Sequence, residues 1–562
     1  MHTDFIEYRP VKKEIQGAEE SSTDQVREEE ILVLFTAVEQ DDDAEAVKHA
    51  VRDAHEFLQK LGANRLMIYP FAHLSQNLAK PAEALLVLKT MEKEARDAKI
   101  ETYRAPFGWN KALQVKVKGH PLAEMSRSYG KAATKAQAVA PAIKPQKDLT
   151  EHEMLSRLKK NYFGQLPETD HRIIGERLDL FSFQEPSPGM PLWHQNGVEL
   201  RDILVDFVRK EQKKRGYTEI STPALANTIL WRVSGHWDHY RDGMFLTEMG
   251  GEQFGLKPMN CPSTFLYYKT RRWSYKDLPL RVADFDPLFR NELSGVASGL
   301  FRVKILTQDD AHIFVAEDQV EDELRNVIDL VALFYGIFGL KYTPKISTMP
   351  EDHLGTKEQW DKAVAALVGA VKSKGIEPVI KEREGAFYGP KIDVDVKDSL
   401  GRDWQCATIQ LDFQMPKRLK LTYTGADGKE HTPAVIHRVI YGSLERFIGI
   451  ILEHYQGRLP FWVAPIQVKV IPVSDENKSY AESTLSAILD AGFRAEGDFG
   501  SGTMNSKIRN AQLQKIPVMV IVGEKEQSTG TISVRAREGE VSYGVKLTDF
   551  VAHQRARAAK FE

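Results

Sequence analysis

The chain has 562 residues, of which 42% are hydrophobic and 28% are charged, and its formal net charge is -3. This length exceeds what one hydrophobic core organises, so the composition indicates a globular protein of about three or four domains. The near-neutral charge excludes a chain-wide basic surface for nucleic acid, but it is compatible with an RNA partner that binds local basic patches.

The two cysteines, Cys261 and Cys406, are too few for a disulfide framework, and a reducing cytoplasm fits this composition. The first residues, Met1 to Asp4, contain no basic start followed by an apolar run, so we expect no secretory signal. No apolar stretch approaches the roughly 20 residues that a membrane helix requires. We therefore expect a cytoplasmic protein without a membrane partner.

Residues 1 to about 130 alternate between short apolar runs and amphipathic runs. Val47, Val51, His55 and Leu58 recur at helical spacing, whereas the apolar runs are short enough for strands. We predict, in order, a strand at Ile31–Phe35, a helix at Ala44–Leu61, a strand at Leu66–Pro70 and a helix at Pro81–Ala98. The acidic stretch 18–30 is predicted to be an exposed loop.

Residues 131–164 are predicted to be a linker, because Lys131 to Lys147 is rich in alanine, lysine and proline with little apolar periodicity. From about 165 the pattern becomes mixed. A long amphipathic helix is predicted around Leu200, Leu204 and Phe207, followed by a strand at Glu219–Pro223.

The last hundred residues have the texture of a small α/β domain with a mixed or parallel sheet. Val468–Ile471 and Val518–Val522 are predicted strands, and a helix is predicted between them from about Lys478 to Leu489.

Two short segments indicate the chemistry. Phe289-Arg290-Asn291-Glu292 and Gly442-Ser443-Leu444-Glu445-Arg446 are weak signals alone, because an Arg-x-Glu pair is usually a surface ion pair. Together with the long helix that ends near Pro223, they resemble the three signature motifs of class II aminoacyl-tRNA synthetases, in order. Adenylate formation expels pyrophosphate, and fixed guanidinium groups hold the negative charge that this step develops.

Further segments from about 165 to 555 resemble one family in particular, the threonyl-tRNA synthetases. The matching segments include Asp170-His171-Arg172, Pro188 to His194, Gly235-His236-Trp237, Lys257 to Pro262, Thr307 to His312, Gly385 to Lys391 and Ile436-His437-Arg438.

The resemblance implies a metal site. In this family Cys261, His312 and His437 bind one catalytic zinc ion per chain. Their separation along the chain is not a local zinc signature. As a set, one thiolate and two imidazoles leave a coordination position open, as a catalytic zinc requires. The family uses the open positions to bind the amino and hydroxyl groups of threonine.

Threonine selection explains why a metal and an editing step belong together. Valine lacks the hydroxyl group, so a site that demands a hydroxyl ligand rejects it strongly. Serine lacks one methyl group, which is worth only ~1–3 kcal/mol of discrimination. A threonyl enzyme therefore needs a way to remove serine after it has been attached.

The family match also implies roles for other side chains. Asp310 is expected to hold the threonine amino group with Tyr388 nearby, and Lys391 and His236 are expected active-site residues, His236 near the terminal ribose of tRNA. ATP is expected to bind with Mg²⁺ at Arg290, Glu292, Arg302, Gln405, Gln410 and Arg446. Arg290 and Arg446 are the expected catalytic cations.

The chain departs from the family pattern at two places in this region. Leu306 stands where the family has an aromatic residue that stacks on adenine, and Ser263-Thr264 stand where it has Gly-His. Neither change removes a charge or a metal ligand, so we expect activity to be retained and ATP binding to lose ring stacking.

The first 130 residues resemble the editing domain of archaeal-type threonyl-tRNA synthetases, a fold like that of D-aminoacyl-tRNA deacylases. The match rests on four segments and implies that His73, Lys111 and Glu124 hydrolyse mischarged seryl-tRNA: His2 to Tyr8, Tyr69 to Ser75, Arg104 to Lys111 and Lys118 to Glu124. Asn110 replaces a family tyrosine. The family also has a short apolar strand before the His2 segment, so we expect a sheet that lacks this strand.

The final segment resembles the anticodon-binding domain that several class II synthetases share. The similarity rests on Lys507-Ile508-Arg509, Gly523 to Glu526 and Val534-Arg535, and it implies that Glu526 and Arg535 contact anticodon bases. Ser501 stands where an asparagine is expected.

The sequence thus predicts a multidomain α/β and α+β protein, with an editing domain at 1–130, a linker at 131–164, an antiparallel-sheet class II catalytic domain at 165–460 and an anticodon-binding domain at 461–562. The implied partners are tRNA(Thr), ATP, L-threonine and a second copy of the chain. Alternatives are a prolyl or seryl type of synthetase, a chain that is mainly a deacylase, and a decayed paralogue that binds tRNA or mRNA without catalysis. The zinc ligand set argues against the first, and Arg290, Glu292 and Arg446 argue against the others.

Overall fold

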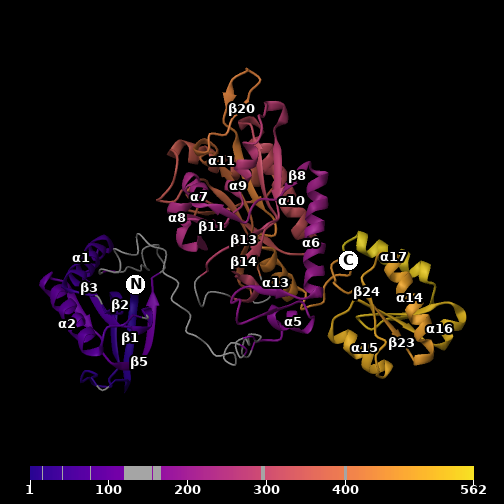
Figure 1. Cartoon of the computed structure of the whole chain (residues 1–562), viewed down its shortest axis with the longest axis horizontal. Helices are drawn as coiled ribbons and strands as arrows, with labels where there is room; N and C mark the ends of the chain where they lie inside the picture. The colour runs from indigo at the N-terminus through magenta and orange to yellow at the C-terminus, as the bar shows by residue number, and fades with distance from the viewer. Residues whose placement is uncertain are drawn as a thin grey trace. The chain divides into compact units, whose positions relative to one another are not determined.

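The structure is a computed structural model of the whole chain (Figure 1). It divides into two compact units, Met1–Asp148 and Leu149–Glu562, which are described separately. The described residues are 1–118, 129, 155, 158, 166–292, 298–397 and 401–562, apart from 16, 41 and 76.

The front unit is built on a five-stranded sheet with strand order β4-β3-β2-β1-β5. Its strands are β1 (His2–Lys13), β2 (Val26–Thr36), β3 (Arg65–Pro70), β4 (Glu101–Arg104) and β5 (Trp109–Val117). β1 runs antiparallel to both β2 and β5, whereas β2, β3 and β4 are mutually parallel. The sheet is therefore mixed.

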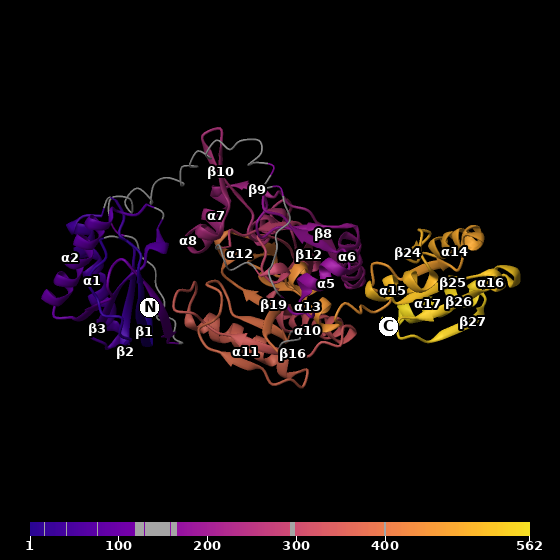
Figure 2. The same ribbon diagram turned by 90° about the horizontal axis from the view of Figure 1, so that it is seen from below.

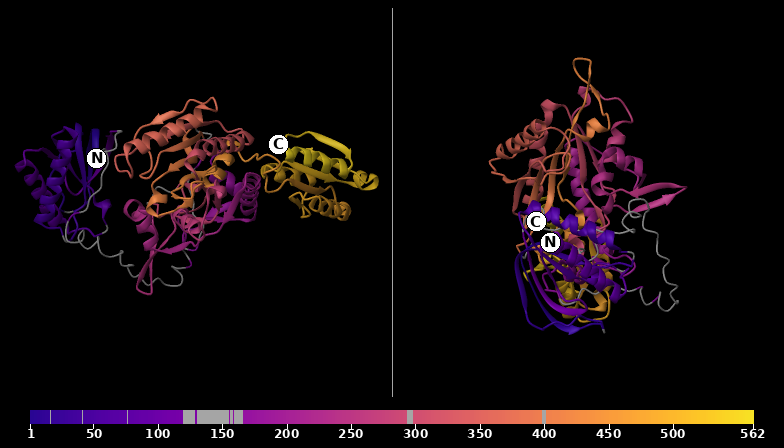
Figure 3. Two further views of the ribbon diagram at one scale, coloured as in Figure 1. Left: turned by 90° about the horizontal axis from the view of Figure 1, so that it is seen from above. Right: turned by 90° about the vertical axis from the view of Figure 1, so that its left-hand side faces the viewer.

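Two helices, α1 (Ala44–Leu61) and α2 (Pro81–Asp97), cover one face of this sheet (Figure 3). α1 begins at Asp43, whose carboxylate accepts hydrogen bonds from two backbone N–H groups, and it ends at Gly62 in the left-handed conformation. Both predicted helices and both predicted strands of this unit are confirmed. The opposite face of the sheet carries a smaller apolar cluster around Tyr8, Met67 and Tyr69.

The prediction of an exposed loop at 18–30 is wrong in two respects. Residues from Val26 onward belong to β2, because β1 pairs with them from Tyr8 opposite Val26 to His2 opposite Leu32. In the part of the chain before β2, the Glu19 side chain is only 16% exposed. Charged residues fit this strand because ion pairs such as Arg65–Glu28 satisfy them.

β2 extends beyond its pairing with β1. The N–H of Val33 donates to the carbonyl of Met1, and Leu34 to Thr36 pair with β3 on the other side. A cavity of about 370 Å³ lies against this end of β2, between the strand and the two helices. β2, α1 and α2 therefore enclose this cavity.

The second unit contains an eight-stranded sheet with strand order β17-β16-β18-β19-β22-β15-β12-β8. Neighbouring strands from β16 to β12 are antiparallel, and only the outermost pairs, β16 with β17 and β12 with β8, are parallel. The strands are β8 (Tyr217–Ile220), β12 (Leu280–Asp284), β15 (Asp310–Val315), β16 (Tyr342–Ser347), β17 (Val379–Lys381), β18 (Lys391–Lys397), β19 (Asp403–Asp412) and β22 (Ala434–Val439).

Helices lie around this sheet (Figure 2). They bury a large apolar core against it. α10 (Val320–Ile337) and α11 (Lys357–Lys372) contribute Leu324, Val331 and Leu367 to it. Further helices are α5 (His171–Arg177), α6 (Gln195–Lys214), α7 (Thr228–Ser234), α8 (His236–Tyr240), α9 (Cys261–Tyr268), α12 (Met415–Arg418) and α13 (Leu444–His454).

Shorter strands complete this region in hairpins and one three-stranded sheet, β10-β11-β9. They are β6 (Phe181–Phe183), β7 (Pro191–Trp193), β9 (Leu225–Asn227), β10 (Leu246–Met249), β11 (Glu252–Leu256), β13 (Pro287–Phe289), β14 (Ile305–Thr307), β20 (Tyr423–Thr424) and β21 (Glu430–His431). β13 and β14 carry the chain into and out of the segment that contains Arg290 and Arg302.

The last sheet has strand order β24-β23-β25-β26-β27 and is mixed. Its strands are β23 (Val468–Pro472), β24 (Ala495–Gly497), β25 (Val518–Val522), β26 (Ile532–Ala536) and β27 (Val541–Val545). One face packs on α14 (Lys478–Asp490) and α17 (Leu547–Ala559), and the other packs on α15 (Met504–Leu513). The short α16 (Glu524–Thr529) follows β25.

The remaining sequence-based predictions fare as follows. The long helix is confirmed as α6, the strand predicted at Glu219–Pro223 ends earlier, at Ile220, and the tail strands and helix are confirmed as β23, β25 and α14. The predicted linker 131–164 lies almost entirely outside the described residues. Among the helices that the structure describes, none is long and apolar enough to span a membrane.

Candidate active site

Strand register places four predicted site residues in one row across the large sheet. Lys391 lies opposite Gln410, Gln410 opposite His437, and His437 opposite His312. Directly paired residues project from the same face of a sheet. The register of β18, β19, β22 and β15 therefore gathers residues that are far apart in sequence.

Cys261 joins His312 and His437 to form a buried cluster. One ligand atom from each side chain lies within 4.8 Å of the others, and all three side chains are buried. Among the residues that the structure describes, the buried Nδ1 atom of His312 has no hydrogen-bond partner. A buried donor or acceptor without a partner costs free energy, and a metal ion would satisfy it.

The surroundings of this cluster set its charge. Burial raises the pKa of the Cys261 thiol well above its usual range and lowers the pKa of His312 well below it. A bound cation would reverse the first effect, because a coordinating thiol is deprotonated. The Nε2 atom of His437 lies 3.0 Å from Oδ2 of Asp412, a contact that holds the ring orientation.

A cavity of about 360 Å³ opens beside the cluster. Neither His236 nor Lys391 belongs to its lining. The lining contains every residue that was predicted to bind ATP, threonine or metal: Cys261, Arg290, Glu292, Arg302, Asp310, His312, Tyr388, Gln405, Gln410, His437 and Arg446. Leu306 also lines it, at the position where an aromatic residue was expected. Burial raises the pKa of Asp310, and its neighbours His437 and Arg438 oppose that effect.

Three arginines converge on the cavity. Arg446 follows the helix N-cap Ser443 on α13, and its guanidinium donates to the carbonyls of Gln405 at 2.7 Å and Phe301 at 3.0 Å. Burial lowers the pKa of Arg446, and Arg290 and Arg302 add to this effect. Positive charge gathered in a partly dry site is suited to binding an anionic ligand.

Glu292 and Arg302 lie opposite each other in this segment, with Nε of Arg302 3.0 Å from the Glu292 carboxylate. His171 holds the backbone at Leu300, between Glu292 and Arg302. Its Nε2 accepts a hydrogen bond from the Leu300 N–H, and its Nδ1 lies 2.8 Å from the Glu453 carboxylate. Asp170, His171 and Glu453 are close enough to bind a metal, but these hydrogen bonds already occupy both ring nitrogens.

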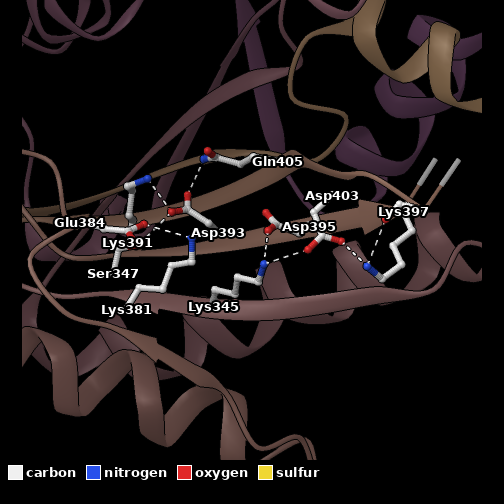
Figure 4. A network of polar contacts seen from close by, with 11 residues as sticks. Lys345, Ser347, Lys381, Glu384, Lys391, Asp393, Asp395, Lys397, Asp403 and Gln405 are labelled. Carbon is white, nitrogen blue, oxygen red and sulfur yellow. Dashed lines mark hydrogen bonds and ion pairs between the residues drawn. The ribbon is translucent and has the colours of Figure 1, made fainter. Parts of the chain in front are cut away.

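Figure 4 shows a polar network along β16, β18 and β19 that sequence reasoning missed. Asp393 accepts hydrogen bonds from Lys391 and Gln405, each at 2.5 Å, and from Ser347 at 3.0 Å. Lys391 and Asp393 are two residues apart on one strand, so they share a face. That spacing is the only sequence signal that pointed to Asp393.

His236 and Gln410 are buried beside the cluster. The Nε2 atom of His236 lies 3.6 Å from Sγ of Cys261, and Nδ1 lies 2.9 Å from the Ser234 hydroxyl. Burial lowers the pKa of His236 to about 4, so its ring is neutral at neutral pH. Gln410 donates to the Gly389 carbonyl at 3.1 Å.

In the front unit, Lys111 lies on β5 and its ammonium donates to the carbonyls of Pro106 and Trp109. Burial lowers the pKa of Lys111 to about 8. His73 lies in the short helix η1 (Ala72–Leu74), and Glu124 falls outside the described residues. Asn110, at the family's tyrosine position, donates to Glu14.

In the last domain, Glu526 and Arg535 lie on α16 and β26. The Glu526 carboxylate accepts hydrogen bonds from the Gly523 N–H and the Ser533 hydroxyl. The Nε of Arg535 is buried without a partner among the described residues. Ser501 lies before α15.

Three sequence profiles match the chain in order. Residues 1–129 match the archaea-specific editing domain of threonyl-tRNA synthetase, residues 245–455 match the tRNA synthetase class II core domain (G, H, P, S and T), and residues 467–556 match an anticodon binding domain.

Two solved structures that are described as threonyl-tRNA synthetases are similar to this chain. A crystal structure described as the RNA binding domain of threonyl-tRNA synthetase from Cryptosporidium parvum is 40% identical in sequence, with a TM-score of 0.67, and the alignment covers 69% of this chain and 98% of that one. The chain belongs to the threonyl-tRNA synthetase family. A putative threonyl-tRNA synthetase from Aeropyrum pernix is 31% identical, with a TM-score of 0.61, over 70% of this chain and 97% of that one.

Two curated threonine–tRNA ligases are also similar in sequence to this chain. The threonine–tRNA ligase of Caldanaerobacter subterraneus is 50% identical over 68% of this chain, and that of Clostridium tetani is 48% identical over 68%. The chain spans 59% and 60% of the length of these two relatives. This chain combines a match to the class II core domain with a match to the archaea-specific editing domain.

Proposed function

We propose that the chain is a threonine–tRNA ligase, which activates L-threonine with ATP and Mg²⁺ and transfers it to the 3′ end of tRNA(Thr). The observation that carries this proposal is the buried group of Cys261, His312 and His437, beside a cavity that three arginines line. Neither feature alone specifies a reaction. Together they support a hydroxyl-selective metal site next to an ATP site.

Cys261, His312 and His437 would hold one zinc ion per chain. One thiol and two imidazoles fit a catalytic rather than a structural zinc, because a structural site usually has four protein ligands. When bound, zinc would supply open coordination positions for the amino and hydroxyl groups of threonine. The orphaned Nδ1 of His312 and the buried thiol of Cys261 support this fit.

The other side chains around the cavity would bind ATP and threonine. Arg290 and Arg446 would bind ATP phosphates, and Glu292 the adenine amino group, with Arg302, Gln405 and Gln410 completing the nucleotide site. Asp310 would accept hydrogen bonds from the threonine ammonium, with Tyr388 beside it. The hydrogen bonds of Arg446 to two backbone carbonyls hold its guanidinium in place before ATP arrives.

His236 and Lys391 would act nearest the reacting groups. A neutral His236 ring beside the metal cluster is suited to receive a proton from the tRNA terminal ribose. Lys391, which Asp393 holds, would add positive charge beside Gln410, its partner on the neighbouring strand.

The front unit would remove serine from mischarged seryl-tRNA(Thr). Two features support this proposal: the match of residues 1–129 to the editing domain, and the partly buried ammonium of Lys111. Lys111, with His73 and Glu124, would orient water or the ester carbonyl. The domain boundaries 1–130, 131–164, 165–460 and 461–562 belong to this proposal, as do base contacts by Glu526 and Arg535 and a homodimeric assembly.

The ligase proposal is tested by measuring charging of tRNA(Thr) transcript with threonine, together with zinc content. The unmodified chain is expected to contain one zinc ion and to charge threonine, and Cys261→Ala is expected to lose both. Cys406→Ala, which changes the other buried cysteine, is expected to keep its zinc. Threonine charging by metal-free protein would overturn the zinc assignment.

The editing proposal is tested by deacylation of pre-made seryl-tRNA(Thr). The unmodified chain and Lys116→Ala, an exposed lysine on the same strand, are expected to release serine rapidly, whereas Lys111→Ala is expected to be slow. Threonyl-tRNA(Thr) is expected to stay intact with all three proteins. Equal rates for the unmodified chain and Lys111→Ala would contradict the role of Lys111.

A further inference from the structure

Glu19 makes an unusually complete set of contacts with the segment that leads to Lys111. Its carboxylate accepts hydrogen bonds from Nη1 of Arg104 at 2.6 Å, from Nη2 of Arg104 at 2.9 Å and from the Phe107 N–H at 2.9 Å. The Glu19 and Arg104 side chains are only 16% and 12% exposed. A bidentate guanidinium–carboxylate pair fixes both position and orientation.

The backbone of Glu19 contacts the same segment. Its N–H donates to the Phe107 carbonyl at 3.2 Å, and its carbonyl accepts from Nε1 of Trp109 at 2.8 Å. Glu19 therefore bonds to the 104–109 segment through side chain, N–H and carbonyl. Hydrogen bonds from Arg104 keep the pKa of Glu19 below its usual range, so the carboxylate is charged at neutral pH.

Close packing over Gly108 leaves little room for this segment to move. Gly108 has a φ of +81°, and a Cβ there would lie 2.8 Å from Cγ1 of Ile15 and 2.9 Å from Cα of Ala18. The chain before Glu19 therefore lies directly on the turn. Glycine satisfies both the left-handed backbone and the close approach.

The turn that Glu19 holds contains both hydrogen-bond acceptors of Lys111. The Lys111 ammonium donates to the Pro106 carbonyl at 2.9 Å and to the Trp109 carbonyl at 3.1 Å, and it lies 5.1 Å from the centre of the Tyr69 ring. Any change in the path of residues 106–109 would move these carbonyls, and the ammonium with them.

We propose that Glu19 is the positioning residue of the editing site: it fixes the turn that holds the Lys111 ammonium, and it brings a carboxylate to that turn. The inference rests on the proposed editing function and names a residue that would act through Lys111 without contacting the substrate. Arg104, which also pairs with Glu92 on α2, anchors Glu19 to the body of the domain.

The electrostatics around Lys111 agree with this role. Burial lowers the pKa of Lys111, and the Glu19 carboxylate acts in the opposite direction. Tyr69, whose ring lies beside the Lys111 ammonium, has a pKa that burial raises to about 12, so it is neutral. Removing the charge of Glu19 would leave burial unopposed.

Glu19→Gln tests the proposal, and Glu20→Gln is the matched control, because Glu20 is 93% exposed and pairs with Lys13. Two readouts are measured on the whole chain: kcat and KM for seryl-tRNA(Thr) deacylation, and labelling of Lys111 by a pulse of acetic anhydride between pH 6 and 10, read by mass spectrometry. Glu19→Asp serves as the conservative variant.

Glu19→Gln is expected to lower kcat about tenfold with little change in KM, because the lost interaction acts after binding. Its Lys111 is expected to be labelled about threefold more at pH 7, because the neutral amine becomes more abundant. Glu20→Gln should match the unmodified chain in both readouts, and Glu19→Asp should recover part of the labelling pattern.

The two readouts separate failure of this inference from failure of the editing function. If acetic anhydride labels Lys111 equally in Glu19→Gln and in the unmodified chain, the positioning role is wrong, whatever the deacylation rate. If labelling changes as expected but no protein releases serine, Glu19 positions Lys111 and the proposed editing function is wrong.

Discussion

The Nε2 atom of His437 lies 3.0 Å from Oδ2 of Asp412, and the Asp412 side chain is fully buried. This contact leaves Nδ1 of His437 for the group that also contains Cys261 and His312. Removing a carboxylate that orients a ligating imidazole typically weakens metal binding 10–100-fold. We therefore expect Asp412→Asn to bind zinc at least ~10-fold more weakly than the unmodified chain. Competition with a chromogenic chelator measures it.

Asp427→Asn is the matched control for Asp412→Asn, because Asp427 makes a similar 2.9 Å contact with His431 at an exposed site. It is expected to bind zinc as the unmodified chain does. Equal zinc affinity for all three proteins would remove Asp412 from the metal site.

Arg446→Ala and Arg290→Ala are each expected to reduce threonine-dependent ATP–pyrophosphate exchange about 100-fold or more, because each would hold charge that develops in the transition state. Arg325→Ala, which removes a partly exposed arginine on α10, is expected to leave the exchange rate unchanged. Circular dichroism checks that the variants are folded. Exchange that persists in both active-site variants would assign ATP to another surface.

Arg535→Ala is expected to weaken tRNA(Thr) recognition by ~1–3 kcal/mol, the usual cost of losing a base contact. Its buried Nε lacks a partner among the described residues, so a base edge would satisfy it. Because this change would leave the ATP site intact, KM for tRNA should rise while pyrophosphate exchange stays constant. Lys546→Ala, at an exposed lysine, controls for the loss of one positive charge. A parallel fall in pyrophosphate exchange would instead indicate a folding defect.

Lys111 should make the stability of the front unit depend on pH. Its pKa is about 8 in the folded chain and near 10.5 as a free side chain, so the unfolded state binds more protons between these values. Stability therefore rises with pH from 8 to 10.5, as the cost of burying a charged ammonium disappears. Lys111→Met should be more stable than the unmodified chain at pH 7, and this advantage should shrink by pH 10. Hydrogen exchange of β5 measures it, and a constant difference across this range would refute it.

Local sequence patterns predicted the helices and strands whose ends carry capping residues or glycine. The α1 helix follows from its apolar stripe, with Asp43 before it and Gly62 after it. The β2 strand was predicted too short, because its charged first half is defined by pairing with β1. Such pairing is a long-range property that a window of sequence does not contain.

The same distinction holds for the site. Cys261, His312 and His437 are too far apart in sequence for their spacing to suggest a metal, and the resemblance to a known family selected them. Their proximity follows from the register of β15 and β22 and the placement of α9. Asp393, Asp412 and Glu19 escaped prediction because each contacts a partner on another strand or segment: Gln405 on β19, His437 on β22 and Arg104 on β4.

The central claim, that the catalytic domain activates threonine, is tested most directly by ATP–pyrophosphate exchange with each of the twenty amino acids. The account predicts that threonine gives the fastest exchange, that serine follows within about 10–200-fold because one methyl group separates them, and that valine is much slower because it lacks the hydroxyl group. Faster exchange with any other amino acid, or none with threonine, would contradict it.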